Sequence, residues 1–85
     1  AYEPVWAIGT GIPDKPESAV EMSLFIKQQL NTHYKLPIPV LYGGSVKAEN
    51  TESFLERKEI NGALVGGASL RPKNFIGIVR SVVKQ

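Results

Sequence analysis

The chain has 85 residues, a length that allows one small domain at most. Its 42% hydrophobic and 21% charged residues are typical of a folded globular protein, and a formal charge of +2 without a basic cluster argues against a nucleic-acid partner. No apolar run approaches the roughly 20 residues that span a bilayer, so we expect no membrane partner. The absence of cysteine excludes disulfides and thiolate metal sites, and it fits the cytoplasmic location that we expect.

The first apolar run, residues 2–7, predicts a short strand and the point at which the chain leaves the sheet. Glu3 then lies at the carboxyl end of this strand, where α/β enzymes place their catalytic groups. Pro4 lacks a backbone N–H and has a fixed φ, so the strand ends there. Gly9 and Gly11 allow the loop that follows to approach a ligand with bare backbone. We therefore expect a base next to a mobile, amide-rich lid.

A helix is expected to follow this loop. Asp14 or Lys15 caps it, and Pro16 lies in its first turn. Its apolar residues recur at spacings of three and four, which predicts one buried face: Ala19, Met22, Phe25, Ile26 and Leu30. A proline-containing loop over residues 31–39 comes next. His33 lies in this loop, and because it is the only histidine we expect a solvated side chain and no metal site.

Two further strand–helix pairs complete the predicted pattern. Residues 40–42 form a short apolar strand, typical of a buried parallel strand, and residues 48–57 form a polar helix. Two residues of that helix are predicted to be buried, Phe54 and Leu55. Residues 63–65 form the third strand, and the last helix begins at Pro72 with an inner stripe of Phe75, Ile78, Val79 and Val82. The expected architecture is α/β, with three parallel strands joined by crossover helices.

Each predicted strand runs into a glycine-rich loop, over residues 9–11, 43–44 and 66–67. The carboxyl ends of parallel strands meet at one edge of a sheet, so the three loops should open together. Their backbone N–H groups can converge on one anion, and (β/α)8 barrels commonly bind phosphate with their last two loops. The alternative is that these glycines only form tight turns or allow close packing. The shared edge and the carboxylate of Glu3 favour the anion site.

Three runs of residues resemble the active-site motifs of the triosephosphate isomerase family, in order and in spacing. They are Tyr2-Glu3-Pro4-Val5-Trp6-Ala7-Ile8-Gly9-Thr10-Gly11, Tyr42-Gly43-Gly44-Ser45-Val46 and Leu64-Val65-Gly66-Gly67-Ala68-Ser69-Leu70. The resemblance covers the whole chain. It implies that residues 1–85 form the sixth, seventh and eighth βα units of a single TIM-barrel domain, about a third of a barrel of ~250 residues.

The resemblance also implies roles for the matched residues. Glu3 matches the base that interconverts dihydroxyacetone phosphate and glyceraldehyde 3-phosphate, a reaction of glycolysis and gluconeogenesis that needs no cofactor. Residues 4–14 match the closing lid, whose first hinge is Pro4, Val5 and Trp6. Backbone amides match the phosphate ligands at Gly9, Ser45, Gly66 and Gly67. Two side chains match those that fasten the closed lid: Tyr42, to an amide near Asp14, and Ser45, to an amide near Gly11.

The chain departs from the family pattern in two ways. Ile12-Pro13-Asp14 stands where the second hinge is often Lys-Thr-Ala, and Pro13 removes one freely turning φ. The family's electrophilic histidine and its substrate-binding lysine and asparagine come from earlier strands. We therefore expect the isolated chain to be inactive and to self-associate or require the missing barrel units, whereas the resemblance implies a homodimer for the complete enzyme.

Other interpretations of the sequence stay open. The chain could belong to a related (β/α)8 phosphate-binding enzyme of different chemistry, although a phosphate site alone needs neither Glu3 nor Trp6. It could also be a barrel fragment without activity that associates through its exposed strand edges. For Tyr42 and Trp6, composition alone favours ordinary aromatic core residues.

Overall fold

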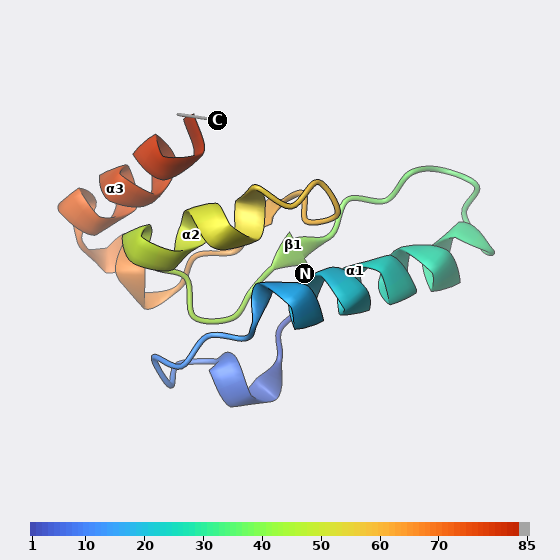
Figure 1. Cartoon of the computed structure of the whole chain (residues 1–85), viewed down its shortest axis with the longest axis horizontal. Coiled ribbons are helices and arrows are strands. Elements are labelled where there is room, and N and C mark those ends of the chain that lie inside the picture. Colours follow the sequence, from blue (N-terminus) through green and yellow to red (C-terminus); the bar gives the residue numbers. More distant parts are fainter. Residues whose placement is uncertain (84–85) are drawn as a thin grey trace.

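The computed structural model describes residues 1–83. Its three helices are α1 (Pro16–Asn31), α2 (Ala48–Leu55) and α3 (Pro72–Val83), and its two strands are β1 (Leu41–Tyr42) and β2 (Gly62–Ala63). Two short 3-10 helices, η1 (Val5–Ala7) and η2 (Gly67–Leu70), lie in the loops. Figure 1 shows β1 near the centre, with α1 on one side and α2 and α3 together on the other.

The sheet is parallel, and its order follows the sequence. In the pairing of β1 with β2, Leu41 lies opposite Gly62 and Tyr42 lies opposite Ala63. On the other side of β1, Tyr2 forms a single parallel bridge with Tyr42. There the Tyr2 N–H donates to the Leu41 carbonyl, and the Gly43 N–H donates to the Tyr2 carbonyl, each at 2.8 Å. Three consecutive parallel segments followed by helices confirm the predicted α/β class.

The predicted strands were too long. In the first segment, whose strand was predicted to end at Glu3, only Tyr2 pairs, and the chain turns after Pro4 into η1, where the Ala7 N–H donates to the Pro4 carbonyl at 2.9 Å. The missing donor of Pro4 explains this early exit. The third strand ends at Ala63 rather than at residue 65, although the Leu64 N–H still donates to the Tyr42 carbonyl at 2.8 Å.

Helices α1 and α3 begin at the prolines that predicted them, but they bury fewer residues than expected. In α1 the buried positions are Ala19 and Ser23, whereas Met22 and Phe25 are exposed. Lys15 occupies the N-cap position, and no side chain caps the helix there. In α3 the only buried residue is Ile78, and the rest of the predicted stripe is exposed: Phe75, Val79 and Val82. Period alone does not decide burial, because each face also needs a neighbouring element to pack against.

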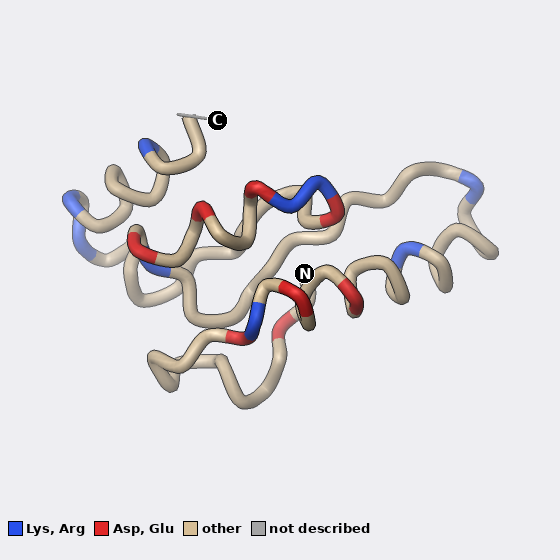
Figure 2. The backbone as a smooth tube through the Cα atoms, viewed as in Figure 1, with Lys and Arg blue, Asp and Glu red and all other residues tan. Residues whose placement is uncertain are grey.

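The predicted helix over residues 48–57 is shorter in the structure, ending as α2 at Leu55. Phe54 is buried, as predicted, and Leu55 is only partly buried. An exposed ion pair between Arg57 and Glu17, at 3.2 Å, joins this end of α2 to the start of α1. Figure 2 shows basic and acidic residues interspersed along the chain.

The core centres on the end of β1. Tyr42 stacks on Phe54, with ring centroids 4.0 Å apart and an interplanar angle of 10°. The other buried members of this cluster are Ala19, Val46, Ile60 and Ile78. The core therefore lies beneath the loop that follows β1 and supports it. Among residues 1–83, no helix has the length and apolarity to cross a membrane.

Candidate active site

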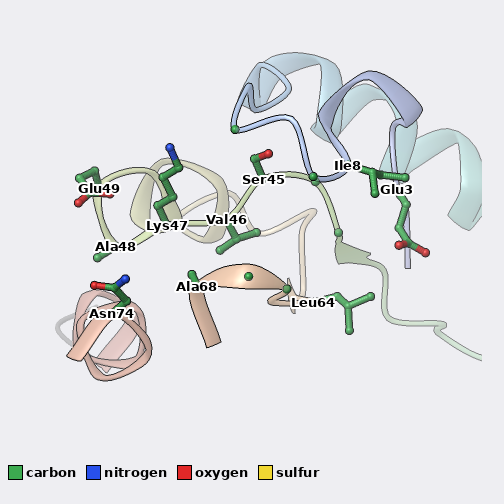
Figure 3. Close-up of a pocket in the computed structure, with 16 residues that line it drawn as sticks. Glu3, Ile8, Ser45, Val46, Lys47, Ala48, Glu49, Leu64, Ala68 and Asn74 are labelled. Atoms are coloured by element: carbon green, nitrogen blue, oxygen red, sulfur yellow. The ribbon is translucent and has the colours of Figure 1, made fainter. Parts of the chain in front are cut away.

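A cavity of about 560 Å³ opens at the carboxyl ends of the three parallel segments (Figure 3). It is lined by residues from all three glycine-rich loops, as the sequence predicted. The predicted site residues on its wall are Glu3, Gly9, Gly11, Ser45, Gly66 and Gly67. Pro4, Val5, Trp6 and Tyr42 do not line it. The topology thus gathers residues 64 positions apart in the chain around one space.

Glu3 is the carboxylate that the first parallel segment places on the wall of this cavity. It directly follows the Tyr2 bridge, and its side chain is exposed to the cavity and to solvent. Glu49 is another carboxylate on the wall, but Figure 3 places it at the opposite end of the cavity from Glu3. Within the described part of the chain, no three histidine, cysteine or acidic residues gather as a metal site would require.

The glycines of the three loops serve two different purposes. A Cβ at Gly43 would lie 2.7 Å from Cγ of Glu3, so this glycine lets the carboxylate side chain lie against the loop. A Cβ at Gly44 would overlap the Tyr42 phenol. For this pair, the close-packing interpretation is correct. A Cβ at Gly66 or Gly67 would meet nothing within 4 Å, so the space in front of their backbone is open to a ligand.

The segment predicted to be the lid, residues 4–14, is held by two hydrogen bonds, one to Tyr42 at the end of β1 and one from Ser45 in the loop that follows. The Tyr42 hydroxyl accepts from the Asp14 N–H at 2.8 Å, which is the contact that the resemblance implied. Ser45 Oγ donates to the Ala7 carbonyl at 2.7 Å. This contact differs from the one with an amide near Gly11 that the resemblance implied for the closed lid, which stays a prediction. A carbonyl at the end of η1 has a free lone pair that a hydroxyl can reach, and sequence spacing does not reveal it.

The lid itself exposes apolar side chains. Trp6 is 56% exposed and Val5 is 79% exposed, so the core interpretation is wrong for Trp6. It is correct for Tyr42, which is 1% exposed and also contacts the lid. Gly9 and Gly11 have φ of 67° and 75°, a region that favours glycine. These two positions allow the lid to fold back toward the cavity.

Burial and the Asp14 carboxylate both raise the pKa values of two tyrosines near the second end of the lid. Burial raises the pKa of Tyr42, the hydrogen bond from the Asp14 backbone lowers it, and the Asp14 carboxylate raises it again. The pKa of Tyr2 is raised too, first by burial and then by Asp14. Asp14 is 7% exposed; its Oδ1 accepts from the Lys15 N–H at 2.8 Å, while its Oδ2 has no hydrogen-bond partner.

Several cavity residues were not predicted. Four of them lie inside the three motifs without having been given a role there, and the others precede or begin the helices: Ile8, Val46, Leu64 and Ala68, and Lys47, Ala48, Glu49 and Asn74. Their positions next to the glycine loops were the only signal that could have found them. His33 is exposed, packs edge-on against Tyr34 and is not on the cavity wall, in keeping with an ordinary solvated residue.

Consecutive parallel βα units with a cavity at the carboxyl ends of their strands are the repeating element of (β/α)8 barrels. The family model described as triosephosphate isomerase matches residues 1–82. The chain therefore belongs to the triosephosphate isomerase family.

Individual relatives agree with this assignment. Triosephosphate isomerase of Aquifex aeolicus is 54% identical over 84 residues, which cover 95% of this chain and 34% of the relative. That of Mesomycoplasma hyorhinis is 51% identical over 79 residues, covering 93% of this chain and 31% of the relative. The crystal structure of the Bartonella henselae enzyme matches 99% of this chain and 33% of its own, with a TM-score of 0.81 and 34% identity. This confirms the TIM-barrel fold class. The chain spans about a third of the length of these relatives.

Proposed function

We propose that residues 1–85 are the carboxyl-terminal segment of a single TIM-barrel domain, its sixth to eighth βα units. In the complete barrel this segment supplies the base, the lid and the phosphate-binding loops of a triosephosphate isomerase. The observation that carries the proposal is the cavity shared by Glu3 and the open glycine backbone at Gly66 and Gly67. The family membership and the preserved order of the three motifs support it.

The proposed reaction moves one proton between adjacent carbons. The Glu3 carboxylate takes a proton from the CH2OH carbon of dihydroxyacetone phosphate and returns it to the neighbouring carbon, while a second proton moves between the two oxygens. Glyceraldehyde 3-phosphate results, without net gain or loss of atoms or electrons. No cofactor is needed, because the adjacent carbonyl makes the carbon acidic once its oxygen is stabilised. The family pattern assigns that stabilisation to the histidine and lysine of earlier strands.

The glycine loops hold the phosphate in this proposal. The backbone N–H groups of Ser45, Gly66 and Gly67 face the dianion, and Gly9 adds its own when the lid covers the substrate. Because backbone amides carry no net charge and occupy little space, several can approach one phosphate. The lid then excludes water, which strengthens both the base and the phosphate contacts. The bonds from Tyr42 and Ser45 to the two ends of the lid support its part in this scheme.

The same proposal covers the setting of the enzyme. Its substrate is a small phosphorylated triose, and its reaction belongs to glycolysis and gluconeogenesis. The complete enzyme is a homodimer in the cytoplasm.

The test of the proposal is Glu3→Gln in a complete barrel, in which residues 1–85 are preceded by five further βα units. Loss of the base should reduce turnover by ~10²–10⁴, while inhibition by inorganic phosphate stays close to that of the unaltered barrel. Glu49→Gln is the matched control, because it removes a carboxylate at the far end of the same cavity. Near-normal turnover of the Glu3 variant would remove the central residue of the proposal.

A further inference from the structure

Asn50 lies in the first turn of α2 and contacts the loop after β1 with both ends of its side-chain amide. Its Nδ2 donates to the Ser45 carbonyl at 2.9 Å, and its Oδ1 accepts from the Lys47 N–H at 2.8 Å. The side chain therefore bridges the segment between Ser45 and the start of the helix. Asn50 is half-buried and is not on the cavity wall.

Ser45 is the residue that connects Asn50 with the cavity and with the lid. Its Oγ donates to the Ala7 carbonyl of the lid at 2.7 Å, and the residue is on the cavity wall. The Ser45 side chain and its N–H both extend from the Ser45 Cα, whose orientation relative to the following peptide depends on the ψ angle of Ser45. The Nδ2 bond of Asn50 fixes that peptide by its carbonyl oxygen.

We propose that Asn50 is a positioning residue for Ser45, which aligns the phosphate-binding loop and the lid contact together; this rests on the proposed function. Asn is suited to the position because a single short side chain offers a donor and an acceptor. Asp would retain the acceptor for the Lys47 N–H, and its charge is favourable at a helix amino terminus. It would, however, present an oxygen instead of a donor to the Ser45 carbonyl. Asn50→Asp thus keeps the hydrogen bond that caps the helix and removes the one that holds Ser45.

The experiment measures KM, kcat and inhibition by inorganic phosphate in the complete barrel. Asn50→Asp is combined with Glu49→Gln, so that the net charge stays that of the unaltered barrel, and Glu49→Gln alone is measured beside it. Relative to the unaltered barrel, whose net charge it keeps, the double variant should raise KM and the phosphate inhibition constant together by about 3- to 10-fold, the factor expected for one net hydrogen bond.

Thr51→Val is the matched structural control. Thr51 Oγ1 donates to the Lys47 carbonyl in the same turn of α2, and nothing links it directly to Ser45. Loss of this bond should lower the melting temperature and leave KM and phosphate inhibition within about twofold of the unaltered barrel. Asn50→Ser, a neutral variant whose shorter side chain falls short of Ser45, is expected to show the same rise in both constants as Asn50→Asp.

The outcomes separate the two proposals. Unchanged KM and phosphate inhibition in both Asn50 variants would overturn the positioning role, while activity of the unaltered barrel would leave the proposed function standing. An equal rise in the Thr51 variant would also overturn it, because any loosening of the helix start would then suffice. An unaltered barrel that neither isomerises triose phosphate nor binds phosphate would overturn the proposed function itself.

Discussion

Tyr42→Phe isolates a single hydrogen bond between the core and the lid. The Tyr42 ring is 1% exposed and stacks on Phe54, with centroids 4.0 Å apart. Its hydroxyl accepts from the Asp14 N–H at 2.8 Å. Phe keeps the ring and its stacking, so the substitution removes the hydroxyl alone.

The expected loss of stability follows from the group left behind. Asp14 is 7% exposed, so without the phenol its N–H has no partner in a site that excludes water. An unsatisfied buried donor costs about 1–3 kcal/mol. We expect the free energy of unfolding of the complete barrel to fall by that amount. The lid equilibrium can shift by no more than the same free energy, which limits the loss in kcat/KM to about 100-fold.

The same variant should change the response of the barrel to alkaline pH. An unfolded tyrosine titrates near pH 10, and burial raises the pKa of Tyr42 in the folded chain. Because the unfolded state loses its proton first, the stability due to Tyr42 is complete below pH 10 and is lost as the pH rises through the folded value. Tyr42→Phe lacks this titration. Its free energy of unfolding should therefore fall less steeply above pH 10, with the raised pKa of Tyr2 leaving a residual slope.

The assay is urea unfolding of the complete barrel at intervals from pH 7 to pH 11, with turnover measured at neutral pH. Tyr34→Phe serves as the control, because Tyr34 is 59% exposed and contacts His33 rather than the lid. It should change neither the stability nor the slope. A Tyr42 variant with unaltered stability at pH 8 and an unaltered slope above pH 10 would refute the hydrogen-bond argument.

Three further predictions concern the cavity and the chain as a whole. Gly67→Val would fill the open space in front of the phosphate-binding backbone and weaken the binding of both the substrate and inorganic phosphate. Normal inhibition by phosphate would place the anion elsewhere. Gly43→Ala would put a Cβ 2.7 Å from Cγ of Glu3; turnover should fall by ~10² with little change in KM, and normal turnover would show that the base tolerates displacement. Residues 1–85 alone should show no isomerase activity in a coupled assay and should gain it on mixing with the first five βα units; activity from the chain alone would contradict the need for an electrophile.

The parts of the structure that the sequence predicted best are those fixed by local chemistry. Pro16 and Pro72 begin helices because proline suits the first turn, and their effect does not depend on distant residues. The meeting of the glycine loops was predictable for a different reason. Once the segments are parallel and consecutive, topology brings their carboxyl ends to one edge, whatever the detailed register. Glu3, Ser45 and Gly67 could thus be placed on one cavity before any contact was known.

The parts that the sequence did not predict depend on neighbours. Met22 of α1 and Phe75 of α3 follow the helical period and yet are exposed, because burial requires a packing partner as well as an apolar side chain. Hydrogen-bond partners across loops are equally hard to predict. The Ser45 hydroxyl could have reached any free lone pair near the lid, and the choice of Ala7 depends on where η1 places its carbonyl.

Residues 42–45, the last residue of β1 and the loop after it, contact the lid at two places, which gives this short segment more influence on the site than its length suggests. Tyr42 and Ser45 lie three residues apart, yet they contact the lid near both of its ends, at Asp14 and Ala7. Gly43, between them, also determines where the Glu3 side chain lies. A displacement of this loop would therefore disturb the base, the phosphate site and the lid together. A change at Trp6, which is exposed, would alter the lid alone. Substitutions under this loop should thus lower kcat and raise KM in parallel, whereas substitutions on the exposed side of the lid should act mainly on lid motion.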